Sequence, residues 1–282
     1  MNTFPSPLIE VSELQSILES TNLILIDASG GPEAKIYFEK QHIKGAFYID
    51  LETDLSSIGK NAAIGGRHPL PNPEDFAKTL VKFGISPESH VVIYDFNNCA
   101  NSASRFWWML KAFGHDKVQV LNGGFKAALE FGIPISSGFE ETLPLSNYPV
   151  SDWKLPLADI NEVELVSKKE DFIVIDVRAK ERYDGFVEPI DLIAGHIPGA
   201  INIPLTENLD ENGKFLNKDV LKKMYSERLN NTQEEKVIIH CGSGVSACHT
   251  ILAMVYAGFE FPKLYVGSWS EWSRNEKEIT IL

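Results

Sequence analysis

The sequence predicts an α/β protein made of two copies of one domain, each a parallel β-sheet flanked by helices. Three observations predict this fold. Short apolar segments alternate with longer stretches that favour helix, several segments occur twice in the same order, and a region rich in Pro, Ser and Gly separates the two sets. Strands that alternate with helices are typical of parallel sheets covered on both faces.

The repeated segments lie about 144 to 154 residues apart and keep their order along the chain. This spacing indicates a tandem duplication of a whole domain, since short-period repeats of 20–50 residues would indicate a solenoid. The matching pairs are LILID (23–27) with FIVID (172–176), HIKGAFYIDL (42–51) with HIPGAINIPL (196–205), VVIYD (91–95) with VIIHC (237–241), and VQVLNGGF (118–125) with KLYVGSW (263–269).

Two apolar runs predict equivalent helices in the two copies. RFWWMLKAF (105–113) stops at Gly114 and VSACHTILAMVYA (245–257) stops at Gly258. A glycine just after a helical run is a C-cap signal. The stretch between the copies has no sustained period, which indicates a linker. We therefore expect domains over 1–135 and 158–282, joined by a linker over 136–157.

Composition limits the possible partners. The chain has 282 residues and a formal net charge of −13, which argues against nucleic acid or an anionic membrane as a partner. No apolar run is long enough to span a bilayer, and the N-terminal MNTFPSPLIEV lacks the basic and apolar regions of a secretory signal. The three cysteines suit free thiols in a reducing compartment, so we expect a cytoplasmic protein.

His240-Cys241 and Cys248-His249 resemble pairs of zinc ligands. On a strand, loop and helix these side chains would diverge, because neighbours on a helix point about 100° apart. A Cys241–Cys248 disulfide would require the backbone to bend. We therefore expect no metal site, no disulfide and no cofactor.

Cys241 is the candidate nucleophile, because it ends a predicted strand and begins a loop of small residues. Glycines let successive backbone N–H groups point inward, and the following helix adds its positive N-terminal end. Such a loop stabilises a thiolate and holds an anion; the alternative is a buried structural thiol. In the first copy Asp95 takes the place of the thiol. The loop residues predicted to bind the substrate are Gly242, Gly244, Val245 and Ser246.

Two chemistries use a thiolate in a loop of amides. Cysteine phosphatases carry an arginine after five intervening residues, which clamps the oxyanion. Here that position is Ala247, and residues 241–257 contain no arginine. A tighter loop suits a single sulfur atom, because its amides can stabilise the anionic outer sulfur of a persulfide.

The chain resembles the tandem-domain rhodanese family of sulfurtransferases along nearly its whole length, and the 3-mercaptopyruvate branch most closely. The segments that carry the resemblance are CGSGVSA, GHIPGAINIP, YVGSWSEW and YDFNNCANSASRFWWMLKAFGH. The resemblance implies two rhodanese-like domains, of which only the second is catalytic. It also implies transfer of a sulfane sulfur from a small-molecule donor to Cys241, then to a thiol acceptor such as thioredoxin, or to cyanide.

The resemblance further assigns roles to individual residues. Ser243 and His42 match a relay that deprotonates the donor thiol, with Glu33 as the nearest candidate acid, and Arg182 matches the arginine that binds the donor carboxylate. Family members that prefer thiosulfate carry cations just after the cysteine. Gly242 and Ser243 are neutral and therefore favour 3-mercaptopyruvate.

One departure and two alternatives stay open. The family usually has a second arginine in a Glu-Pro-Arg stretch, and this chain has isoleucine at that position, Ile190. Thiosulfate is the alternative donor. A non-catalytic rhodanese module that binds partners is the alternative class, and the presence of Cys241 argues against it. We interpret Arg178 as a member of a structural ion pair, and His68 and His196 as structural.

Overall fold

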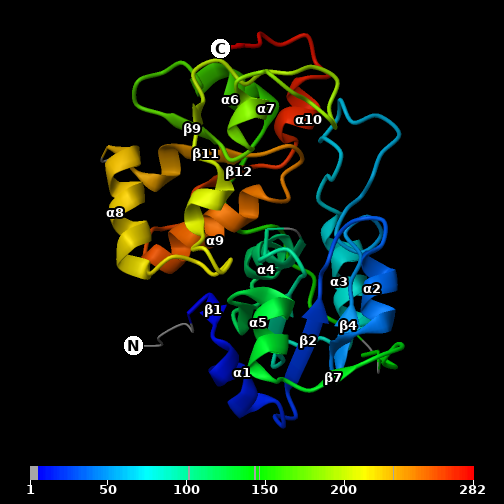
Figure 1. Cartoon of the computed structure of the whole chain (residues 1–282). Helices are drawn as coiled ribbons and strands as arrows, with labels where there is room; N and C mark the ends of the chain where they lie inside the picture. Colours follow the sequence, from blue (N-terminus) through cyan, green and yellow to red (C-terminus); the bar gives the residue numbers. More distant parts are fainter. Residues whose placement is uncertain (1–5, 101, 143, 146, 231) are drawn as a thin grey trace. The chain divides into compact units, whose positions relative to one another are not determined.

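The computed structural model of the chain contains two five-stranded parallel β-sheets, each in its own compact unit (Figure 1). It describes residues 6–100, 102–142, 144–145, 147–230 and 232–282. The alternation of buried apolar strands and helices in both units confirms the predicted α/β class. None of the helices in these described ranges is long and apolar enough to cross a membrane.

Unit 1 comprises the described residues of 1–56, 71–154 and 211–214. Its sheet has the order β1-β6-β5-β2-β4, and the central strand β5 is buried over four of its five residues. The strands are β1 (Leu8–Ile9), β2 (Leu23–Asp27), β4 (Ala46–Tyr48), β5 (His90–Tyr94) and β6 (Val118–Leu121), with an antiparallel pair β3 (His42–Ile43) and β7 (Ile135–Ser136). The helices are α1 (Val11–Ile17), α2 (Ala34–Lys40), α3 (Pro73–Lys82), α4 (Ser102–Ala112) and α5 (Gly124–Phe131).

Unit 2 comprises residues 57–70, 155–210 and 215–282, with the sheet order β10-β9-β11-β12-β8. Figure 1 shows α8 and α9 on one face of this sheet and α6, α7 and α10 on the other. The strands are β8 (Leu157–Ala158), β9 (Ile173–Asp176), β10 (Ile201–Asn202), β11 (Val237–His240) and β12 (Lys263–Tyr265). The helices are α6 (Ile160–Val166), α7 (Lys180–Tyr183), α8 (Lys218–Leu229), α9 (Ala247–Ala257) and α10 (Ser268–Trp272), with 3₁₀ turns η1 (Leu205–Asn208) and η2 (Glu234–Lys236).

The two sheets have the same topology, which confirms the duplication. Read from the opposite edge, unit 2 has the order β8-β12-β11-β9-β10, which matches β1-β6-β5-β2-β4 strand for strand. In each unit the chain runs from β2 or β9 to the neighbouring edge strand, β4 or β10, and then crosses back to β5 or β11 on the other side of β2 or β9. The loops after β9 and β11 therefore diverge, and in open parallel sheets this switch point is where ligands bind.

The two predicted helices are present. α4 ends at Ala112, two residues before the expected Gly114, and α9 ends at Ala257, directly before the expected Gly258. The Gly258 N–H donates to the Met254 and Val255 carbonyl oxygens, so this glycine caps α9. α9 begins at Ala247, two residues after the predicted start, because the small residues before it belong to the cysteine loop.

The units do not follow the contiguous division that we expected. Residues 57–70 of the first repeat group with unit 2, and residues 211–214 of the second repeat group with unit 1. Most of the expected linker over 136–157 also groups with unit 1, where the Trp153 ring packs 5.1 Å from the ring of Phe76. A loop without a hydrophobic period carries no sequence signal for the unit on which it packs.

Candidate active site

Cys241 lies directly after β11, and only 1% of its surface is exposed. α10 fixes the backbone on both sides of the thiol. The Cys241 N–H donates to Ser268 Oγ at 3.1 Å, while the Trp269 and Ser270 N–H groups donate to the carbonyl oxygens of Cys241 and Gly242 at 3.0 and 2.8 Å. The segment YVGSWSEW therefore positions the cysteine loop.

The loop after Cys241 leaves backbone donors available. Within the described part of the chain, no hydrogen bond is recorded for the N–H groups of Gly242, Ser243, Val245 and Ser246. Gly244 has a φ of +71°, and a Cβ there would overlap the Val266 carbonyl oxygen and lie 2.8 Å from the Val266 Cα. The loop thus has the tight turn and the amide donors that an anionic sulfur requires.

Arg182, the predicted substrate arginine, projects from α7 toward this loop. Its Nη1 and Nη2 each lie 3.7 Å from the point where a Cβ of residue 242 would be. Glu188 orients the guanidinium through Nη2–Oε1 and Nε–Oε2 hydrogen bonds of 2.6 and 3.2 Å. Burial would raise the pKa of Glu188, but the hydrogen bonds from Arg182 and from backbone N–H groups lower it, so the pair is ionised at neutral pH.

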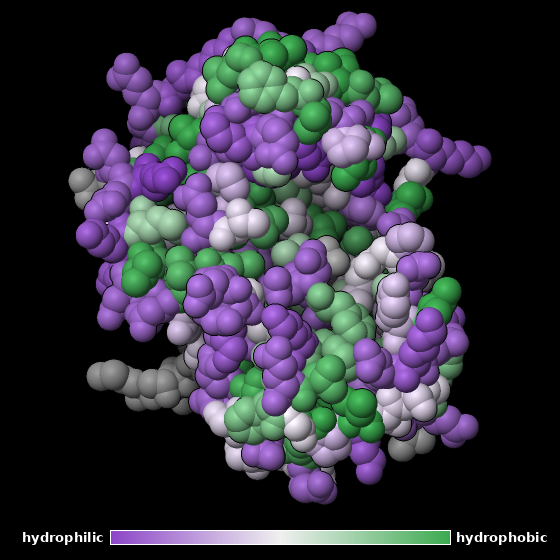
Figure 2. Space-filling model, viewed as in Figure 1, coloured by the Kyte–Doolittle hydropathy of each residue, from purple (hydrophilic) through white to green (hydrophobic). Residues whose placement is uncertain are grey.

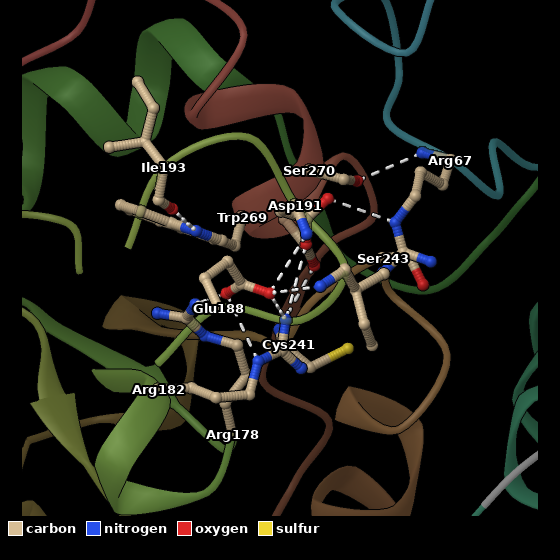
Figure 3. Close-up of polar contacts among 12 residues, drawn as sticks. Arg67, Arg178, Arg182, Glu188, Asp191, Ile193, Cys241, Ser243, Trp269 and Ser270 are labelled. Atoms are coloured by element: carbon tan, nitrogen blue, oxygen red, sulfur yellow. Dashed lines mark hydrogen bonds and ion pairs between the residues drawn. The ribbon is translucent and has the colours of Figure 1, made fainter. Parts of the chain in front are cut away.

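A second guanidinium, that of Arg67, lies at the same loop, and the sequence did not predict it. Its Nη2 lies 3.1 Å from the same point, where a Cβ of residue 242 would be. In Figure 3 Arg67 and Arg182 lie on opposite sides of Cys241. Ile190 takes the place of the arginine expected in a Glu-Pro-Arg stretch, and it is 53% exposed. Two arginines therefore flank Gly242, although one comes from an unexpected segment.

Within unit 2, the segment 57–70 contacts α10. The Gly65 N–H donates to Glu271 Oε1 at 2.7 Å, and the Arg67 N–H donates to Ser270 Oγ at 3.0 Å. Gly66 has a φ of +80°, and a Cβ there would overlap the Gly267 carbonyl oxygen. The Gly65-Gly66 pair just before Arg67 was the one signal in the sequence for such a close approach.

Asp191 joins the arginines of the site. Its carboxylate is fully buried and pairs with Arg67 at 3.2 Å, Arg274 at 2.8 Å and Arg182 at 3.5 Å (Figure 3). Together with the pairs that Arg178 makes, this ion-pair network contains four arginines and three carboxylates among the described residues. It has one excess positive charge, in a chain whose formal net charge is −13.

The imidazole at Ser243 is His68. Its Nδ1 lies 2.8 Å from Ser243 Oγ, a contact that our interpretation of His68 as structural did not include. His42, which we predicted for this relay, is fully buried in unit 1, where its Nδ1 lies 2.8 Å from the Phe38 carbonyl oxygen and its ring stacks 4.0 Å from the Phe38 ring. The histidine that contacts Ser243 is therefore His68.

The reason lies in the repeat. His196, the counterpart of His42, also directs its Nδ1 to a carbonyl oxygen, that of Tyr183 at 2.8 Å, and stacks on the Tyr183 ring at 3.8 Å. Both histidines pin a turn, as predicted for His196. Glu33, the candidate acid, also lies in unit 1 and accepts a hydrogen bond from the Tyr37 hydroxyl at 3.0 Å.

Arg178 is a structural residue, as predicted. Its side chain is 1% exposed, and its Nη2 lies 2.6 Å from Asp176 Oδ2 and 2.7 Å from the Gly195 carbonyl oxygen. Burial would raise the pKa of Asp176, but His240 and Arg178 lower it, and burial lowers the pKa of His240. Asp176 and Arg178 therefore form a buried ion pair, and Asp176 lies in register with His240, the residue before Cys241.

The other two cysteines, Cys99 and Cys248, are buried. Cys99, Cys241 and Cys248 are all free, and Cys248 Sγ lies 3.5 Å from the Gly244 carbonyl oxygen. His249 stacks on the Phe215 ring at 4.5 Å. No three His, Cys, Asp or Glu side chains of the residues described here are grouped in a way that could hold a metal ion.

The chain belongs to the rhodanese family: the model of the rhodanese-like domain matches residues 10–130 and 159–275. The matches extend to full-length enzymes, and the chain is a sulfurtransferase. A probable 3-mercaptopyruvate sulfurtransferase of Pseudomonas aeruginosa is 37% identical over 94% of both chains. A putative thiosulfate sulfurtransferase of Mycobacterium tuberculosis is 36% identical over 86% of this chain and 84% of its own. The solved 3-mercaptopyruvate sulfurtransferase of Leishmania major superposes with a TM-score of 0.82 at 29% identity, over 95% of this chain and 75% of that one.

Replacing Gly244 with alanine should disrupt the site. The added Cβ meets backbone atoms of Val266, which cannot move aside as the end of a side chain can. We expect Gly244→Ala to lose sulfurtransferase activity by at least about tenfold and to lower the melting temperature. Gly132→Ala is the matched control, because its φ is +89° but nothing lies within 4 Å of its Cβ point. It should show only the backbone penalty of about 1–2 kcal/mol and full activity. Equal effects of both changes would contradict the steric argument.

Proposed function

We propose that this chain is a 3-mercaptopyruvate sulfurtransferase that carries the transferred sulfur as a persulfide on Cys241. The observation that carries the proposal is the position of two guanidinium groups, those of Arg67 and Arg182, within 3.1–3.7 Å of one point beside Gly242. A carboxylate bound there would have its α-keto acid chain directed at the neighbouring thiol. Charge-assisted hydrogen bonds of this kind are the strong ones in protein recognition.

The Ser243–His68 pair supports the proton transfer in this reaction. His68 Nδ1 lies 2.8 Å from Ser243 Oγ, and Ser243 is two positions after Cys241 in the loop. From there the pair can take the proton of the donor thiol. The Cys241 thiolate attacks the donor sulfur, the carbon–sulfur bond breaks, and its electron pair remains on carbon. The proton returned to that carbon gives pyruvate, while the sulfur stays on Cys241 as an anionic persulfide.

The second half of the reaction transfers this outer sulfur to an acceptor. A thiolate or cyanide attacks the outer sulfur, the sulfur–sulfur bond breaks, and the Cys241 thiolate is released. The products are an acceptor persulfide or thiocyanate. Because Cys241 is 1% exposed, the attacking atom must protrude from its carrier, as in thioredoxin or a small thiol. The three free cysteines support a reducing, cytoplasmic setting.

Thiosulfate is the second candidate donor. The residues after Cys241 are neutral, which favours the carboxylate donor, but Arg67 and Arg182 supply two positive charges beside Gly242 from other segments. A doubly charged donor can pair with both. The ratio of kcat/KM for the two donors, measured on the same preparation, decides between them.

Incubation with 3-mercaptopyruvate and no acceptor should raise the intact mass by one sulfur atom. Peptide mapping should place the added sulfur on Cys241, since this thiol stands at the switch point of the sheet. Cys241→Ser should fold and gain no sulfur, while Cys99→Ser and Cys248→Ser should behave like the wild type. A label on either of those two cysteines would refute the assignment.

Loss of either flanking guanidinium should weaken binding of the donor. Arg67→Met and Arg182→Met keep much of the apolar stem and remove the charge. Each should raise KM for 3-mercaptopyruvate about ten- to hundredfold, because a charge-assisted hydrogen bond contributes about 1.5–3 kcal/mol. Arg228→Met removes an exposed ion pair with Glu207 and serves as control. If Arg67→Met leaves KM unchanged, Arg67 does not bind the carboxylate.

His68 should matter for one donor more than for the other. His68→Ala should lower kcat with 3-mercaptopyruvate by about 10²–10⁴, because a positioned proton acceptor contributes that much. It should lower kcat with thiosulfate much less, since that dianion has no thiol proton to lose at neutral pH. His42→Ala should instead reduce the melting temperature, because His42 is fully buried in unit 1. Equal losses with both donors would assign His68 a structural role only.

A further inference from the structure

The segment that follows α7 exposes an unusual number of apolar side chains. Five of the eight residues in 186–193 are large, apolar and exposed, and we call them the apolar rim: Phe186 (71% exposed), Val187 (47%), Ile190 (53%), Leu192 (69%) and Ile193 (47%). Ile281, 61% exposed, extends it, since its side chain lies against the positions of Gly185 and Gly195 at the two ends of the segment. Figure 2 shows apolar residues at the surface over the end of unit 2 that carries α7.

The rim is held firmly against the active site. The two charged residues of the segment, Glu188 and Asp191, turn inward, with 4% and 0% of their side chains exposed, and bind the site arginines. The Ile190 N–H donates to Glu188 Oε1 at 3.1 Å, and the Ile193 carbonyl oxygen accepts from Trp269 Nε1 at 2.9 Å (Figure 3). The inward anchors and outward apolar side chains belong to one ordered loop.

The exposed apolar side chains of the rim are not needed to hold the site arginines in place. The anchors of the loop are its carboxylates and backbone, so polar side chains at the outward positions would serve equally well. Full burial of a Phe, Leu or Ile side chain is favourable by about 1.5–3 kcal/mol. Contiguous apolar surface beside a functional site marks a place where another molecule binds.

The second half of the proposed reaction indicates which molecule. Small acceptors reach a persulfide without touching the rim, whereas a protein acceptor must bring its thiol to a cysteine that is 1% exposed and needs a surface to bind beside it. The rim presents no outward charge in a chain of net charge −13, so it suits a partner whose thiol is surrounded by apolar residues. The formal charge disfavours an anionic membrane as the occupant.

We propose that the apolar rim docks a protein sulfur acceptor, a folded protein that presents a cysteine thiolate within an apolar surface. This inference rests on the proposed persulfide chemistry and adds the surface on which a protein acceptor binds. The acceptor thiolate attacks the outer sulfur of the Cys241 persulfide, the Cys241 thiolate leaves, and the acceptor carries away the persulfide. No electrons are gained or lost overall in this transfer.

The test compares a protein acceptor with a small one. The double variant Phe186→Ser/Leu192→Ser changes the two most exposed rim residues. Their side chains are hydrocarbons, so the substitutions remove no side-chain hydrogen bond. With 3-mercaptopyruvate as donor, we expect KM for reduced thioredoxin to rise at least tenfold and kcat/KM for cyanide to stay within twofold. Leu165→Ser/Val220→Ser, at similarly exposed positions on α6 and α8, is the matched control and should change neither value.

The outcomes separate the two proposals. If the wild type forms no thiocyanate, the sulfur-transfer proposal itself fails. If thiocyanate forms but thioredoxin receives no sulfur, or its KM is the same for the rim variant, the docking proposal alone is overturned. Loss of cyanide activity in the folded variant would make the rim part of the donor site and would also overturn it. Sedimentation that shows a wild-type dimer, dissociated by the variant, would assign the rim to a second copy instead.

Discussion

One buried carboxylate, that of Asp191, holds together the segments that form the site. It pairs with Arg67 from the segment 57–70, with Arg182 from α7, and with Arg274 just after α10. Its side chain is fully buried among these three arginines, and it helps to orient them. Removing one member of a buried ion pair typically costs about 3–5 kcal/mol, since the remaining charge is left without compensation. The network therefore fixes the two guanidinium groups beside Gly242 before any donor binds, which lowers the cost of ordering them on binding.

The two units show why only one copy carries the thiol. Asp176 in unit 2 is paired with Arg178, whereas its counterpart in unit 1, Asp27, has Ser29 at the position of that arginine. Burial raises the pKa of Asp27 to about 7, and the charge of the neighbouring Asp95 adds to the effect. Asp95 occupies the place of Cys241 at the end of the equivalent strand. Unit 1 thus places two carboxylic acid groups where unit 2 has a thiol and an ion pair, and a negative charge there would repel an anionic sulfur such as the persulfide proposed for unit 2.

Much of this arrangement could be predicted from local patterns, and the failures share one cause. The strands, the capped helices, the cysteine loop and the ion-paired Arg178 are each written in a short stretch of sequence. The contact between His68 and Ser243 joins residues 175 positions apart and depends on a loop that packs away from its own repeat. No period or motif reports such a contact. His42 attracted the relay assignment because its motif is repeated, but the same repetition, in His196, indicates that the motif pins a turn.

Close backbone approach explains how that loop reaches the site at all. The Val266–Gly267 backbone precedes α10, which fixes the cysteine loop, and glycines from two separate segments lie close to it. A Cβ at Gly244 would overlap the Val266 carbonyl oxygen, and a Cβ at Gly66 would overlap that of Gly267 and lie 2.8 Å from Ser270 Oγ. Side chains at these glycines would push the cysteine loop and the Arg67-His68 segment away from the Val266–Gly267 backbone. The thiol loop and the second arginine are therefore brought to one place by the same strip of backbone. The relevant sequence signal is the set of glycines that allows this approach, more than any charged residue.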